Sequence, residues 1–171
     1  ISKRQVHDLL RSRPDGKHDW MRLQGRVYGT HMAQAEMIEG VADFLLRCKA
    51  AAIPVHIVSH KTEFGHFDPD MINLRQAALR WMENQDLFDA RRFDLCRRNI
   101  HFESTRHEKV ERIAALHCTH FIDDLTKVFL DADFPDSTRG FLFTAGEPAI
   151  KTGPYTQLPT WAAISDAVFK V

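Results

Sequence analysis

Apolar positions along this chain follow two different spacings, and the changes of spacing separate short strands from helices. Runs of β-branched and aromatic residues, typical of buried parallel strands, occupy residues 55–58, 100–102, 119–122 and 140–143. Elsewhere apolar residues recur every three or four positions, which predicts amphipathic helices at residues 41–52, 74–82, 108–116, 125–130 and 161–169. Strands separated by helices in this order favour a parallel sheet covered by helices on both faces.

The first 38 residues have the spacing of polar-faced helices and no strand pattern. The turn triplet Pro14-Asp15-Gly16 interrupts them, and a second interruption lies at Gly29-Thr30. Ser2 suits a helix N-cap, and the chain begins with Ile1 rather than Met. We therefore expect the printed sequence to begin downstream of its biological start. Loops are predicted at residues 60–70 and 146–159, which contain glycine and proline.

Polar residues with matching chemistry lie at the ends of the predicted strands. Ser59 follows the first strand, Lys109 lies near the start of the helix after the second, and Asp123-Asp124 follow the third. Because loops at the carboxyl ends of parallel strands converge on one crevice, we expect these side chains to gather there. A hydroxyl and an ammonium suit phosphoryl oxygens, and adjacent carboxylates supply the hard oxygen ligands that Mg²⁺ prefers.

In this order and strand context, these residues resemble three motifs of the haloacid-dehalogenase-like (HAD) hydrolase superfamily. The segments that resemble motifs II, III and IV are Val55-His56-Ile57-Val58-Ser59, His107-Glu108-Lys109 and His120-Phe121-Ile122-Asp123-Asp124. Ile38-Glu39-Gly40-Val41 also resembles the family's lead-in to its second strand. The resemblance covers roughly residues 40 to 143 of the chain.

The resemblance implies a Rossmann-like three-layer α/β/α fold with a parallel sheet. It also implies a Mg²⁺-dependent phosphohydrolase that acts on a small phosphorylated metabolite, with phosphatase chemistry favoured over phosphonatase or dehalogenase chemistry. In the family's terms Ser59 binds phosphate, Lys109 orients the nucleophile and the phosphate, and Asp123 with Asp124 holds the metal. Ser59 and Lys109 are the expected catalytic residues.

One part of the family pattern is missing. Motif I is a hydrophobic strand ending in Asp-x-Asp, and Asp68-Pro69-Asp70 has these letters but lies in a predicted loop. The resemblance therefore implies that residues 39–171 form a HAD-like core lacking its first strand, and that residues 1–38 form a small helical cap. Whether the protein is an enzyme stays open: it is a hydrolase if the native protein has that strand upstream, and inactive as printed.

Two residues after motif II extend the predicted site. His60 and Lys61 are placed to line the phosphate and substrate pocket, although exposed loop residues are the alternative explanation. Ten histidines also suggest zinc, and His117-Cys118-Thr119-His120 is the densest group. Since alternate strand residues point to opposite faces, these four side chains cannot converge on one metal ion.

Each predicted site residue also has a purely structural interpretation. Ser59 can terminate its strand, Lys109 can face water, and Asp123-Asp124 can cap the short helix that starts at Leu125. For the whole chain, the alternative function is a catalytically inactive HAD-like binding or regulatory module. A receiver-type signalling domain fits less well, because its acidic pair lies on the first strand, whereas here the pair follows the third.

Composition limits the partners of the protein. With 171 residues, of which 44% are hydrophobic, one compact domain is expected, and 23 basic residues balance 23 acidic ones. This balance argues against nucleic acid or membrane partners, and no apolar run approaches the roughly 20 residues of a membrane span. Three widely spaced cysteines favour a reducing cytoplasm. Substrate identity and oligomeric state are not predicted.

Overall fold

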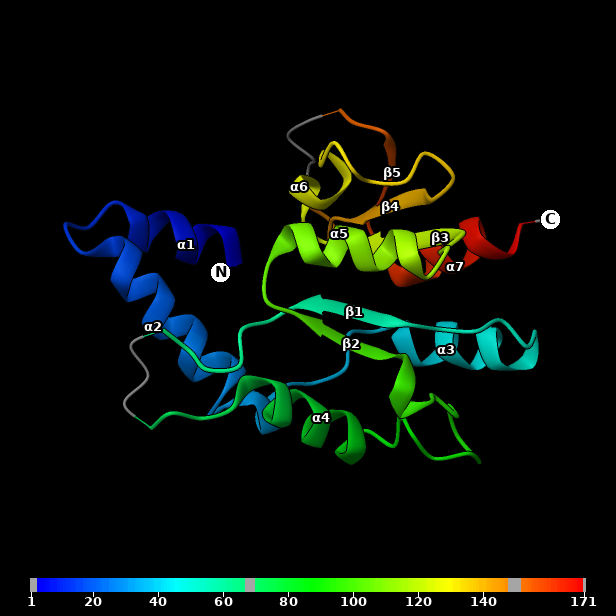
Figure 1. Ribbon diagram of the computed structural model, residues 1–171, viewed down its shortest axis with the longest axis horizontal. Helices are drawn as coiled ribbons and strands as arrows, with labels where there is room; N and C mark the ends of the chain where they lie inside the picture. Colours follow the sequence, from blue (N-terminus) through cyan, green and yellow to red (C-terminus); the bar gives the residue numbers. More distant parts are fainter. Residues whose placement is uncertain (1–2, 67–69, 148–151, 171) are drawn as a thin grey trace. The chain divides into compact units, whose positions relative to one another are not determined.

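The computed structural model describes residues 3–66, 70–147 and 152–170, and the chain divides into two compact units (Figure 1). Unit 1 combines Ile1–Glu36 with Lys61–Leu87, and unit 2 combines Met37–His60 with Phe88–Val171. The sequence pattern places one boundary at residue 38, whereas in the structure the segment after the first strand joins the N-terminal helices. Asp68 and Pro69, part of the Asp-x-Asp sequence in that segment, lie outside the described residues.

Unit 1 is helical throughout its described secondary structure, apart from one isolated β-bridge. Its elements are α1 (Lys3–Arg11), α2 (Gly16–Tyr28), the 3-10 helix η1 (Met32–Gln34) and α4 (Leu74–Asn84). The Asn73 side chain caps α4 by accepting a hydrogen bond from the backbone N–H of Gln76. One face of α4 is buried, and it consists of Leu74, Ala77, Ala78 and Met82.

Two contacts explain why residues 61–87 belong with the N-terminal helices. The indole Nε1 of Trp81 donates a 2.7 Å hydrogen bond to the carbonyl of Ala35. A Cβ added at Gly29 would lie 3.2 Å from a methyl carbon of Leu74, so α4 packs closely against the end of α2 at this point. Helical periodicity reveals an apolar face but not the element it packs against, so the sequence pattern does not reveal this pairing.

Unit 2 contains two small parallel sheets. The first pairs β1 (Ile57–His60) with β2 (Ile100–Glu103). The second has the order β3 (His120–Asp123), β4 (Arg139–Phe143) and β5 (Tyr155–Leu158). The four strands predicted from the sequence are present, and their parallel direction is confirmed. The prediction of a continuous loop at residues 146–159 is wrong, because β5 lies within it.

The helices of unit 2 follow the predicted order. They are α3 (Val41–Ala50), the 3-10 helix η2 (Arg97–Asn99), α5 (Arg106–Ala115), α6 (Thr126–Phe129) and α7 (Trp161–Phe169). A capping box starts α5: the Thr105 hydroxyl accepts from the Glu108 N–H, and the Glu108 carboxylate accepts from the Thr105 N–H. Across the described residues, none of the helices combines the length and apolar character that crossing a membrane requires.

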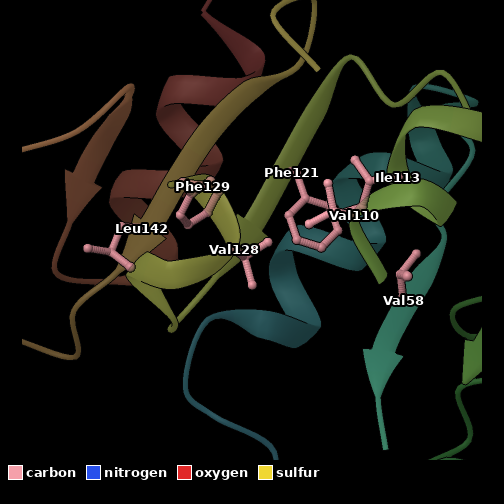
Figure 2. Close-up of a cluster of buried hydrophobic side chains, with 7 residues drawn as sticks. All are labelled: Val58, Val110, Ile113, Phe121, Val128, Phe129 and Leu142. Atoms are coloured by element: carbon pink, nitrogen blue, oxygen red, sulfur yellow. The ribbon is translucent and has the colours of Figure 1, made fainter. Parts of the chain in front are cut away.

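One hydrophobic cluster connects the two sheets of unit 2 (Figure 2). Val110 and Ile113 of α5 are fully buried and belong to the same cluster as Val58 of β1 and Phe121 of β3. Full burial of an aliphatic or phenylalanine side chain contributes about 1.5–3 kcal/mol. The fold is thus mixed α/β with two parallel sheets rather than the expected single sheet, because β1 and β3 share this core without pairing in one ladder.

Candidate functional site

A buried ion pair joins two of the residues that the sequence singled out. The ammonium of Lys109, in the first turns of α5, donates to Oδ2 of Asp123, the last residue of β3. The exposed fractions of the two side chains are only 8% and 6%, so water screens this pair little. The structural alternative for Lys109, a side chain facing water, is therefore wrong.

Local structure explains how these two groups are brought together. The capping box fixes the first turn of α5, and Val110 and Ile113 anchor the helix in the core. Lys109 is adjacent to Val110 and lies over the ring of Phe121, with 5.4 Å between its Nζ and the ring centroid. Phe121 is two residues before Asp123 in β3, so one strand supplies both the apolar support and the carboxylate.

Each oxygen of the Asp123 carboxylate accepts a hydrogen bond. While Oδ2 accepts from Lys109, Oδ1 accepts a 2.8 Å hydrogen bond from the backbone N–H of Leu125. This second bond supports the turn that leads into α6, but it does not cap the helix, because the N-cap residue of α6 is Leu125 and no side chain caps it. Asp123 therefore has a structural role in addition to any ligand that it binds. Asp124, the next residue, is exposed.

His60, the last residue of β1, shares the electrostatic environment of this pair. Partial burial lowers the pKa of His60 below its ordinary value, and the charges of Lys109 and Arg106 add to this effect. The carboxylates of Asp123 and Asp124 act in the opposite direction. The neutral imidazole, which can both donate and accept a hydrogen bond, is therefore favoured at this strand end.

Ser59 and His60 occupy different faces of β1. Val58 is buried in the core beneath α5, and His60 shares its face because side chains alternate along a strand. Ser59 points to the opposite face, and in the described part of the chain its half-buried side chain makes no hydrogen bond with Lys109 or Asp123. A ligand beyond the carboxyl end of the strand can be reached from both faces, so phosphate binding by Ser59 stays a prediction.

Lys61 is the first residue of the second stretch of unit 1, and its described contacts lie within this unit. Its ammonium lies 4.3 Å from the centroid of the Tyr28 ring, and its carbonyl accepts a hydrogen bond from Nε of Arg75. Burial lowers the pKa of Lys61 below its ordinary value. The predicted role of Lys61 in binding phosphate stays a prediction.

The donor set at the end of β3 fits the chemistry of magnesium. Two consecutive carboxylates, from Asp123 and Asp124, offer hard oxygen ligands, and Mg²⁺ typically uses one or two carboxylates together with water and phosphate oxygens. A cation that coordinates Oδ2 of Asp123 would lie next to the ammonium of Lys109, which donates to the same oxygen. These two carboxylates could therefore hold the metal, whose charge would repel the ammonium of Lys109.

A second group with metal-ligating side chains was not predicted from the sequence. His107, Asp131 and Asp133 place their ligand atoms within 4.8 Å of one another. Arg106 lies 3.6 Å from Asp131 and compensates its charge, and two of the three ligand residues are exposed. His107 and Asp131 are 24 residues apart, so no local sequence motif contains both. The Asp-x-Asp spacing of Asp131 and Asp133 was the one sequence signal that could have indicated this group.

No nucleophile strand is found among the described strands of unit 2, since none of them ends in Asp-x-Asp. The site consists of the buried pair of Lys109 and Asp123, with His60 and Asp124 beside it. These groups suit the simultaneous binding of an anion and a cation. Comparison of the chain with protein-family models, with curated proteins and with solved structures finds no match.

Proposed function

We propose that this chain is the phosphate- and magnesium-binding part of a HAD-like phosphohydrolase acting on small phosphorylated metabolites. The observation that carries the proposal is the buried contact between Lys109 and Asp123 at the carboxyl end of β3. A lysine facing water and an aspartate capping a helix would not require this contact. Burying an opposite-charge pair costs desolvation, which makes a functional reason for its presence more plausible.

The proposed roles follow from the chemistry of each side chain. Lys109 offers an ammonium with three donors to phosphoryl oxygens, and the Ser59 hydroxyl offers one more donor. His60 contributes a ring nitrogen as a donor or acceptor to the same ligand. Mg²⁺, held by Asp123 and Asp124, would neutralise charge on the phosphoryl group. The side chains themselves bind and orient the phosphate between β1 and β3.

A Rossmann-like three-layer arrangement is part of this proposal. β1 is hydrogen-bonded to β2 and β3 to β4, so within the described residues β1 and β3 each have one edge without a ladder partner. Unpaired edges in a sheet leave backbone N–H and C=O groups without partners. One further strand ending in Asp-x-Asp, paired to both edges, would merge the sheets and bring a nucleophile beside Lys109. Residues 1–38, which contain α1, α2 and η1, would then form the cap.

The experiment is hydrolysis of p-nitrophenyl phosphate by the complete native protein, with MgCl₂ and with excess EDTA. We expect hydrolysis with Mg²⁺, no hydrolysis with EDTA, and loss of turnover in Asp123→Asn. Asp136→Asn, an exposed aspartate elsewhere in unit 2, is the matched control and should retain activity. Turnover that neither EDTA nor Asp123→Asn reduces would contradict the proposal.

A non-catalytic HAD-like module is the second candidate, and one observation favours it. None of the described strands ends in Asp-x-Asp, and only such a strand would supply the family's nucleophile. A module of this kind would bind inorganic phosphate and Mg²⁺ through the same residues but would not hydrolyse phosphate esters. Binding without turnover in the complete protein would select the module over the enzyme.

A further inference from the structure

We infer that the anion and the cation bind to this site as a linked pair, each raising the affinity of the other. The inference rests on the proposed function, because it concerns the same phosphate and Mg²⁺, but it adds a regulatory property that the proposed function does not require. Its basis is the contact between Lys109 and Asp123, each of which is the other's partner when no ligand is bound.

The cation alone meets an obstacle at Asp123. Oδ1 of this carboxylate accepts from the Leu125 N–H, and Oδ2 accepts from Lys109. A Mg²⁺ ion that coordinates Oδ2 brings a dication next to the ammonium that donates to the same oxygen, and the two positive charges repel each other. Since the Lys109 side chain is 8% exposed, water can screen this repulsion only weakly.

The anion alone meets the complementary obstacle. A phosphate that draws Lys109 away leaves the buried Asp123 carboxylate without its cation, next to a dianion and to the carboxylate of Asp124. Arg106, the other cation near His60, lies 3.6 Å from Asp131 and is already compensated. An unpaired buried carboxylate is strongly unfavourable.

When both ligands bind, every charge regains a partner. The ammonium of Lys109 contacts the phosphate, and Mg²⁺ contacts Asp123 and the phosphate oxygens. Each ligand therefore removes the cost that the other faces when it binds alone. By linkage, phosphate must raise the affinity for Mg²⁺ by the same factor as Mg²⁺ raises the affinity for phosphate.

The test is calorimetric titration of the printed chain with MgCl₂, with and without saturating inorganic phosphate, at constant ionic strength. The reciprocal titration adds phosphate with and without saturating MgCl₂, and a titration without protein corrects for complexes in solution. We expect the affinity in each direction to rise by about tenfold or more, within the usual range of coupling between sites. The two factors should agree within experimental error.

A substitution at Lys109 separates this mechanism from a merely additive one. In Lys109→Met the competitor for Oδ2 of Asp123 is absent, so Mg²⁺ alone should bind more tightly than to the wild type. Phosphate should then raise the Mg²⁺ affinity by a smaller factor than in the wild type, because only its direct contact with Mg²⁺ remains. Lys127→Met, an exposed lysine on α6, is the matched control and should preserve the wild-type coupling. Circular dichroism shows whether each variant is folded, and the wild-type titrations decide the question without them.

The outcomes distinguish the inference from the proposed function. If both ligands bind with independent affinities, or if each weakens the other, the inference is overturned and the proposed function stands. If neither ligand binds, both are overturned. If the two ligands bind cooperatively and the complete protein hydrolyses no phosphate ester, the inference holds and the enzyme proposal fails.

Discussion

Nδ1 of His56, the residue before β1, and Nε2 of His101, in the neighbouring strand β2, face each other at a distance of 3.3 Å. The ring centroids are 5.5 Å apart and the ring planes are inclined by 25°. The distance between the ring centroids is longer than the distance between the two nitrogens by about the sum of the two ring radii. The two nitrogens therefore lie close to the line that joins the ring centres. One shared N–H therefore links the two imidazoles, and protonation of both would break this link.

This pair predicts a loss of stability in mild acid. Burial lowers the pKa of His101 below its ordinary value, Arg112 and His56 add to this effect, and Glu103 opposes it. Because the folded-state pKa lies below the unfolded one, the stabilisation is complete above about pH 6.5 and is lost as the pH falls below that. Urea denaturation at several pH values between 7.5 and 5 should show this decrease.

Replacement of one ring tests the assignment of that pH dependence. His101→Gln should be less stable at pH 7.5 but should lose less further stability on acidification than the wild type. His31→Gln, an exposed histidine in unit 1, should leave the slope unchanged. An unchanged slope in His101→Gln would assign the acid sensitivity to other groups.

The pair of Lys109 and Asp123 predicts a non-additive effect on stability. Lys109→Met leaves Asp123 as an uncompensated buried charge and should cost about 3–5 kcal/mol of unfolding free energy. The double variant Lys109→Met with Asp123→Asn removes that charge and should regain part of the loss. A double-mutant cycle measured by urea denaturation gives the coupling, and simple additivity would contradict a buried ion pair.

The capping box of α5 predicts a smaller effect. Thr105→Ala removes the acceptor for the Glu108 N–H and should lower the unfolding free energy by about 1 kcal/mol. Thr105→Ser keeps the hydroxyl and should remain close to the wild type. Because the cap fixes the turn that carries Lys109, phosphate affinity should fall in Thr105→Ala and stay unchanged in Thr105→Ser.

The close contact of Gly140 with the core predicts an overpacking effect. A Cβ at Gly140 would lie 2.8 Å from Cδ1 and 3.0 Å from Cε1 of the buried Phe129 ring. Gly140→Ala should therefore cost about 1–3 kcal/mol. Combining it with Phe129→Leu should cost less than the sum of the two single changes, because the shorter side chain makes room for the methyl group. Thermal unfolding of the three variants measures this.

Sequence patterns were informative where one element determines its own structure. The β-branched run ending at Val58 and the capping pattern from Thr105 to Glu108 act over a few residues, and both elements appear close to their predicted positions. Lys109 lies in the helix before the third strand and Asp123 at the end of that strand. From these positions the sequence correctly predicted that the two side chains lie close together. Their contact follows from the helix after one parallel strand packing beside the next strand.

Other features depend on partners that a pattern cannot show. β5 contains Thr156 and Gln157 between prolines, so its short polar sequence gave no strand signal, and pairing with β4 determines its conformation. Strand alternation placed His60 rather than Ser59 on the face of Lys109, and this depends on which residue of β1 enters the core. Likewise, nothing local to α4 reveals that its partner is α2.

Because unit 1 is assembled from two separate stretches, a single truncation cannot remove it. Deleting residues 1–36 would uncover Leu74, which packs against Gly29, and would deprive the Trp81 indole of its acceptor at Ala35. The truncated protein would expose the apolar face of α4 to solvent and would be prone to aggregate during expression. Isolating unit 2 therefore requires the removal of residues 1–36 and of residues 61–87, with a short linker that joins His60 to Phe88.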